Sequence, residues 1–222
     1  MGGYTRPSII VLDLDGTIIE FRLELTEAKK RVVEAMVEMG MPEDQISVKE
    51  SIQSLLQKAR DVIGDGRAHL LREKVLSIMK EYEMRAARLS KPREGVVELV
   101  NSLKNAGFRV AVATNTHRDA AVLALERSGL LDKIDAIVTR DDVSNLKPRG
   151  DLLLKVAERM AARPEDILYV GDSVHDFQAA REAGASFIAV EGGIHDRQTF
   201  EQAGCKTIIS WPLELLRILH GE

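Results

Sequence analysis

The pattern of apolar and polar positions divides the chain into one isolated strand, a helical stretch and a long alternating region. The uninterrupted apolar run Ile9–Leu12 predicts a buried β-strand over residues 8–12. After it, apolar residues recur at helical spacing in segments separated by Met41-Pro42 and by Gly64–Gly66. This spacing predicts helices over residues 28–37, 52–63 and 70–82.

Past Pro92 the chain alternates short apolar runs with amphipathic stretches, most of which end at a glycine. The short runs predict strands over residues 109–113, 136–138, 167–170, 187–190 and 207–209. The amphipathic stretches predict helices over residues 96–106, 119–128, 151–162 and 174–183. Strands that alternate with helices of this length are typical of βαβ units, so the sequence predicts an α/β fold with a Rossmann-like parallel sheet core.

The first predicted strand belongs to the same sheet as the later ones. The helical stretch must therefore leave this domain after the first strand and return to it. We expect a core formed by residues 1–20 and 91–222, with an α-helical cap domain of residues 21–90 inserted into it.

Composition narrows the class of protein. The 222 residues carry 31 basic and 35 acidic side chains, a net charge of -4, without long runs of one sign. This balance indicates no nucleic-acid or membrane surface. The single cysteine, Cys205, has no partner for an internal disulfide, which is typical of a reducing cytosol. With no apolar stretch of membrane-spanning length and no apolar signal core at the N-terminus, we expect a cytoplasmic protein.

Polar side chains follow the ends of several predicted strands. Each has an ordinary explanation by itself, such as a turn, a helix cap or a solvated lysine. The carboxyl ends of parallel strands share one edge of the sheet, where open α/β sheets bind ligands, so we expect these side chains to converge. The set comprises Asp13, Asp15, Thr114, Asn115, Lys147, Asp172 and Asp176.

These residues form four motifs, which resemble those of the haloacid dehalogenase (HAD) superfamily and occur in the same order. The motifs are Asp13-Leu-Asp15-Gly16-Thr17, Thr114-Asn115, Lys147-Pro148 and Gly171-Asp172-Ser173-Val-His-Asp176. The helical insert after the first motif is similar to the cap of the phosphoglycolate phosphatase-like branch. The resemblance spans the whole chain and implies a hydrolase that acts on phosphoric monoesters.

The resemblance also implies a role for each motif. Asp13 would be the nucleophile that forms an aspartyl-phosphate, and Asp15 the general acid and base. Thr114 and Lys147 would bind the phosphoryl oxygens, while Asn115 would orient the loop or contact the phosphoryl group. Mg²⁺ would offset the clustered charge. Its implied ligands are Asp13, the backbone carbonyl of Asp15, and Asp172. Asp176 would assist the metal site without contacting the ion directly.

Several alternatives stay open at this point. A β-phosphoglucomutase-like phosphomutase shares all four motifs, and a catalytically silent binding protein could share the fold. A hydrolytic dehalogenase is disfavoured because carbon–halogen cleavage needs no acid such as Asp15. A response-regulator receiver domain is excluded because its phosphorylated Asp lies on the third strand.

The substrate and the oligomeric state are not readable from the sequence. Phosphoglycolate, a sugar phosphate and a nucleotide monophosphate all fit a small phosphorylated metabolite as partner. Two segments depart from common family patterns, residues 18–21 (Ile-Ile-Glu-Phe) and residues 147–150 (Lys-Pro-Arg-Gly). Four cap side chains are candidates to contact an anionic substrate, namely Arg60, Arg67, His69 and Arg72.

Overall fold

The computed structural model describes residues 7–20, 24–47 and 50–220, and these form two compact units. One unit comprises Met1–Arg22 with Ala87–Glu222, and the other comprises Leu23–Ala86. Residue 21, where we expect the insert to begin, and the N-terminal residues 1–6 lie outside the described ranges.

The first unit contains a six-stranded parallel sheet in the order β3-β2-β1-β4-β5-β6. Its strands are β1 (Ile9–Leu12), β2 (Arg109–Ala113), β3 (Ala136–Val138), β4 (Ile167–Gly171), β5 (Ser186–Val190) and β6 (Ile208–Ile209). Every residue of β1 is buried, as expected of a central strand covered on both faces. The parallel pairing confirms the predicted Rossmann-like α/β core.

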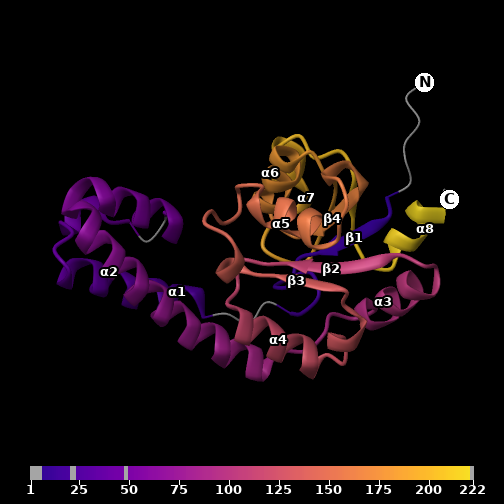
Figure 1. Ribbon diagram of the computed structural model, residues 1–222, viewed down its shortest axis with the longest axis horizontal. Coiled ribbons are helices and arrows are strands. Elements are labelled where there is room, and N and C mark those ends of the chain that lie inside the picture. The colour runs from indigo at the N-terminus through magenta and orange to yellow at the C-terminus, as the bar shows by residue number, and fades with distance from the viewer. Residues whose placement is uncertain (1–6, 21–23, 48–49, 221–222) are drawn as a thin grey trace. The chain divides into compact units, whose positions relative to one another are not determined.

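Helices cover both faces of this sheet (Figure 1), with α5 and α6 on one face and α3 and α4 on the other. The helices of the unit are α3 (Val96–Asn105), α4 (Arg118–Arg127), α5 (Asp151–Arg159), α6 (Val174–Ala183), α7 (Arg197–Gln202) and α8 (Glu214–His220). Short 3₁₀ turns lie at Leu131–Lys133, Arg140–Asp142 and Pro164–Asp166.

The strand registers place the carboxyl ends of β1, β2 and β4 at the same level in the sheet. Leu12 at the end of β1 pairs with Val112 of β2 and with Val170 of β4. The segments that follow these three strands therefore begin side by side at one edge of the sheet. The loops that follow β1, β2, β3 and β4 carry the candidate site residues described below.

The end of α5 and the presence of α7 differ from the sequence expectation for local reasons. Helix α5 ends at Arg159, short of the expected residue 162, because Ala161 adopts a positive φ of 46° that interrupts the helix. Helix α7 was not predicted from the apolar pattern, since Phe200 is its only buried residue. The side chain of Asp196 caps it by accepting from Thr199 N at 2.9 Å.

An ion-pair cluster anchors the loop after β3. Asp142 accepts hydrogen bonds from Arg118 and Arg159, and its carboxylate also accepts from Thr139 N at 2.8 Å. Burial opposes ionisation of Asp142, but the hydrogen bonds from Arg159 and Thr139 outweigh it and lower the pKa to about 2. This carboxylate therefore stabilises the fold in its charged form.

The second unit is helical in its described part. It contains α1 (Leu25–Glu38), a 3₁₀ turn (Glu43–Gln45) and most of α2 (Ile52–Leu89). Gly64, with φ 78° and ψ 160°, breaks α2 into two helical parts at the predicted Gly64–Gly66 punctuation. Apolar side chains of both helices form a core of their own, which includes Val32, Met36, Leu55 and Leu71.

Candidate active site

The loop after β1 carries the first two acidic residues. The Asp13 side chain is buried, and its backbone N–H continues the sheet by donating to Val170 O at 2.9 Å. Asp15 is half-buried and precedes Gly16, which turns the chain with a φ of 82°. A Cβ atom on Gly16 would lie 2.1 Å from Asp172 Oδ2, so only glycine fits there.

The loop after β2 connects two motifs through hydrogen bonds. The side chain of Asn115 accepts from Lys147 N at 3.0 Å and donates to Lys147 O at 3.4 Å, so it holds the backbone of that lysine. Thr114 is buried, and its hydroxyl accepts from Thr116 N at 3.1 Å. Thr116 in turn donates its hydroxyl to Asp15 Oδ2 at 2.5 Å. The helix cap that Thr114 could have supplied is provided by His117.

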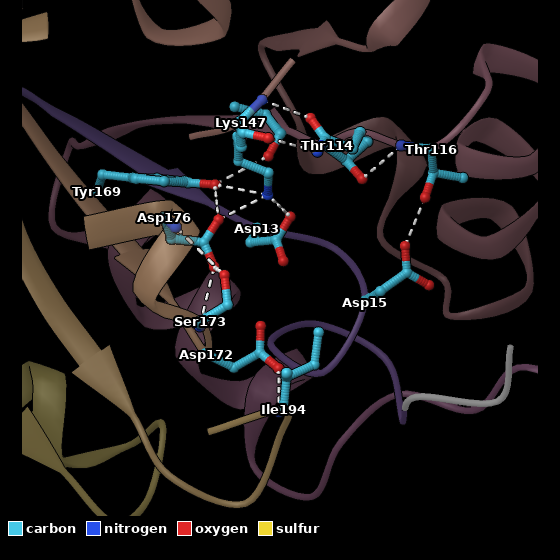
Figure 2. Close-up of polar contacts among 12 residues, drawn as sticks. Asp13, Asp15, Thr114, Thr116, Lys147, Tyr169, Asp172, Ser173, Asp176 and Ile194 are labelled. Carbon is cyan, nitrogen blue, oxygen red and sulfur yellow. Dashed lines mark hydrogen bonds and ion pairs between the residues drawn. The ribbon is translucent and has the colours of Figure 1, made fainter. Parts of the chain in front are cut away.

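Lys147 is the buried cation at the centre of the site (Figure 2). Its Nζ lies 2.7 Å from Asp13 Oδ1, 2.6 Å from Asp176 Oδ1 and 3.1 Å from the Tyr169 hydroxyl. Burial alone would lower the pKa of Lys147, but the carboxylates of Asp13 and Asp176 outweigh it and raise that pKa. The ammonium group is therefore charged at neutral pH, with all three N–H bonds directed at acceptors.

Asp176 is fixed by donors on both of its oxygens. Oδ1 accepts from Lys147 and from the Tyr169 hydroxyl, the latter at 2.8 Å. Oδ2 accepts from Ser173 N at 3.0 Å and from Ser173 Oγ, in the capping box that begins α6. Burial raises the pKa of Asp176, but Lys147 and these hydrogen bonds outweigh it and lower the pKa. Its position in the network suits a residue that orients others.

Asp172 is enclosed by two glycines and one backbone donor. Its Oδ2 accepts from Ile194 N at 2.7 Å, and a Cβ atom on Gly193 would lie only 2.0 Å from the same oxygen. Its Oδ1 is buried and has no hydrogen-bond partner among the described residues. Burial and the nearby charge of Asp176 raise the pKa of Asp172 to about 7. The unpaired oxygen is the point of the site that most needs a further partner.

The acidic cluster has the donor set of a divalent cation site. Asp13, Asp172 and Asp176 each offer a carboxylate oxygen, and these oxygens lie within 4.8 Å of one another. Burial and the charges of Asp176 and Asp172 raise the pKa of Asp13 well above its usual value, and Lys147 only partly offsets them. A hard cation bound by carboxylate oxygens would neutralise this excess charge and pair the free oxygen of Asp172. The residues present therefore fit a divalent metal ion.

The sequence matches the haloacid dehalogenase-like hydrolase family over residues 10–190, a span that includes all four motifs. The chain belongs to the haloacid dehalogenase-like hydrolases. It is 28% identical over 215 residues to a phosphoglycolate phosphatase of Nitrosospira multiformis, with 95% of each chain covered. It is 30% identical over 193 residues to a phosphoglycolate phosphatase of Thiobacillus denitrificans, with 83% of each covered.

Solved structures agree with this family membership. The crystal structure of a hydrolase from Pseudomonas syringae has a TM-score of 0.70 to this chain at 30% identity. The match covers 96% of this chain and 98% of that one. The two phosphoglycolate phosphatases place the chain in the phosphoglycolate phosphatase-like branch of the haloacid dehalogenase-like hydrolases. The chain is accordingly a hydrolase of phosphoric monoesters.

The site of this haloacid dehalogenase-like hydrolase contains three contacts that the sequence analysis did not include. They are the hydroxyls of Thr116 and Tyr169 and the backbone N–H of Ile194. Tyr169 carried a usable signal, because a tyrosine inside a buried strand needs a partner for its hydroxyl. The Ile194 contact carried none, since a backbone donor leaves no trace in residue identity.

The four candidate cap residues belong to α2. Arg60 and His69 are exposed, as is Arg67, while Arg72 is partly buried. Arg60 pairs with Asp65 at 3.2 Å.

None of the helices in the described part of the chain is both long enough and apolar enough to span a membrane.

Proposed function

We propose that this phosphatase is Mg²⁺-dependent and hydrolyses a small phosphomonoester through an aspartyl-phosphate on Asp13. The observation that carries the proposal is the pairing of Asp13 with Lys147, inside a buried acidic cluster that leaves one oxygen of Asp172 unpartnered. A carboxylate held next to a fixed ammonium group can attack phosphorus while that ammonium offsets charge on the phosphoryl oxygens.

In the first step, an oxygen of Asp13 forms a bond to phosphorus as the bond from phosphorus to the ester oxygen breaks. Asp15 donates a proton to the departing oxygen. Burial raises the pKa of Asp15, while Thr116 and Lys147 oppose that rise, so its carboxyl keeps a proton at higher pH than an exposed aspartate would. The raised pKa suits Asp15 to the role of general acid.

In the second step, water attacks the phosphorus of the aspartyl-phosphate and Asp15 takes the proton from that water. The bond between phosphorus and Asp13 breaks, which regenerates the carboxylate. Thr114 and Lys147 hold the phosphoryl oxygens throughout, and Asn115 keeps the backbone of Lys147 in place.

Mg²⁺ in this proposal is held by Asp13, the backbone carbonyl of Asp15 and Asp172, with Asp176 orienting Lys147 behind them. The bound ion supplies positive charge that phosphoryl transfer requires and that one lysine cannot provide among these carboxylates.

We also propose that the helical unit, Leu23–Ala86, is the cap that determines which small phosphorylated metabolite is accepted. The buried free thiol of Cys205 favours a cytoplasmic location.

The proposal is tested by Asp13→Asn in an assay of phosphate release from an aryl phosphate, with and without Mg²⁺. We expect loss of phosphate release in Asp13→Asn, and loss in the parent protein when EDTA replaces Mg²⁺. Asp132→Asn, at an exposed position of the first unit, is the matched control and should retain full activity. Equal rates in Asp13→Asn and the parent protein would refute the catalytic assignment. Phosphoryl transfer to a sugar phosphate without release of phosphate would indicate a phosphomutase.

A further inference from the structure

Arg93 is a half-buried cation beside the acidic cluster that the proposed chemistry does not use. It follows Pro92 in the first unit, and its backbone N–H donates to Ile18 O at 2.9 Å. One guanidinium nitrogen, Nη1, donates to the carbonyl of Gly16. The other, Nη2, donates to the carbonyl of Glu191 at 2.6 Å. The side chain thus joins two segments far apart in the sequence.

Both of these carbonyls belong to segments that enclose Asp172. Gly16 lies against the carboxylate from one side. Glu191 begins the loop that continues through Gly193, which also contacts the carboxylate, to Ile194, whose N–H donates to it. Arg93 therefore connects the two walls of the space in which Asp172 is held.

The loop residue next to Glu191 is shaped to accommodate this guanidinium. A Cβ atom on Gly192 would lie 2.9 Å from Nη2 of Arg93, so the guanidinium packs directly on the loop backbone. An arginine presents several N–H donors in a rigid planar fork, which allows it to bridge two carbonyls at once. A lysine ammonium is a compact point charge and lacks this fork.

The charge of Arg93 by itself works against a bound cation. Burial lowers the pKa of Arg93 and the carboxylate of Asp172 raises it, so the guanidinium interacts electrostatically with that carboxylate. A positive charge near a cation site repels the cation, and removing it should strengthen cation binding on Coulombic grounds alone. A geometric role predicts the opposite sign, which makes the two explanations separable.

We propose that Arg93 is a positioning residue that builds the cation site by fixing the Gly16 turn and the Glu191–Ile194 loop around Asp172. This inference rests on the proposed Mg²⁺ site. Residues behind metal ligands hold those ligands in the geometry required for binding, and their loss typically weakens metal affinity by about 10- to 100-fold. Arg93 would act through two backbone segments and not by contacting the metal.

The test is isothermal titration of Mg²⁺ into the metal-free full-length protein, comparing Arg93→Met, Arg93→Lys and the parent. We expect Arg93→Met to weaken Mg²⁺ binding by about 10-fold or more despite the loss of a positive charge. Arg93→Lys keeps the charge but loses the fork, so it should also weaken binding. Arg127→Met, at an exposed position in the last turn of α4, removes the same charge far along the chain and should leave binding unchanged.

Activity measured over a range of Mg²⁺ concentrations gives a second readout. If Arg93 sets metal affinity, high Mg²⁺ should restore most of kcat in both Arg93 variants, whereas a loss of folded protein would not be restored. Thermal unfolding in EDTA checks that the variants are folded. If Arg93→Met does not fold, the comparison of Mg²⁺ binding is made between Arg93→Lys and the parent.

Two results would overturn the inference. Tighter Mg²⁺ binding in Arg93→Met would show that only the charge of Arg93 affects the site. Unchanged binding would show that Arg93 has no role in it. Binding by Arg93→Lys equal to that of the parent would show that the fork is not required. Failure of the parent itself to bind Mg²⁺ would instead refute the proposed metal site, so the two failures are distinguishable.

Discussion

Replacing Gly193 by alanine tests whether the loop after β5 holds Asp172 in place. The φ angle of Gly193 lies outside the left-handed region, so alanine can adopt this backbone without torsional strain. The nearest obstacle is the side chain of Asp172, to which the three heavy atoms closest to the new Cβ belong. The substitution therefore isolates one steric contact at the acidic cluster.

The size of the effect follows from that contact. The new Cβ atom would lie 2.0 Å from Oδ2, 2.4 Å from Cβ and 2.5 Å from Cγ of Asp172, whereas real Cβ atoms essentially never approach within 3.0 Å. The loop and the carboxylate must separate by about 1 Å, and a misplacement of this size at a catalytic site costs about 100-fold in rate. The same movement breaks the hydrogen bond from Ile194 N. Overpacking of this kind also destabilises the fold by about 1–3 kcal/mol.

The assay is steady-state hydrolysis of an aryl phosphate, together with Mg²⁺ titration and urea unfolding of the same preparations. Gly66→Ala is the matched control, because Gly66 lies inside α2 with nothing within 4 Å of the new Cβ. It should leave activity unchanged and stabilise the protein by about 0.5–1 kcal/mol. Parental activity and Mg²⁺ affinity in Gly193→Ala would refute the claim that this loop positions Asp172.

Three further predictions concern single polar groups. Tyr169→Phe removes a buried hydroxyl that contacts Lys147, and should lower stability by about 2 kcal/mol in urea unfolding and lower kcat by about 10-fold; unchanged values would show that the hydroxyl is dispensable. Thr116→Val removes a hydrogen bond that lowers the pKa of Asp15. In the pH–rate profile for hydrolysis of an alkyl phosphate, the fall in rate caused by deprotonation of Asp15 should occur at higher pH than in the parent protein. A fall at the same pH would contradict the assignment of that deprotonation to Asp15. The pKa of Asp142 falls from 3.8 to about 2 on folding, so its stabilisation is complete above pH 3.8 and disappears as the pH falls toward 2. Asp142→Asn should therefore cost about 1 kcal/mol at pH 7, with the difference from the parent narrowing below pH 4, and a pH-independent difference would exclude this origin.

Much of the core could be predicted because its signals are local. The run Ile9–Leu12 has no polar position, and this indicates a strand covered on both faces whatever its neighbours are. Helix α6 was predicted within the bounds that the structure shows, since Gly184 supplies the left-handed residue that ends it. Helix α7 was missed because six residues with one buried side chain do not establish a helical period.

The site likewise contains residues that the sequence predicts and contacts that it does not. Carboxylates and a lysine at strand ends are visible in the sequence, and the parallel sheet brings Asp13, Lys147, Asp172 and Asp176 into one cluster. The contact between Arg93 and Gly16 is not visible, because it joins a side chain to a backbone carbonyl across 77 positions. Contacts of that kind depend on the tertiary path of the chain and not on residue spacing.

The central claim is that Asp13 carries the phosphoryl group during turnover, and rapid-quench labelling tests it most directly. The substrate is a nitrophenyl phosphate with a radiolabelled phosphoryl group, whose leaving group needs no proton. Asp15→Asn should then slow only the second step, so that the labelled enzyme accumulates. We predict label on the peptide that contains Asp13, approaching one phosphoryl group per chain. Release of phosphate without any labelled enzyme, or label on a different residue, would contradict the proposed mechanism.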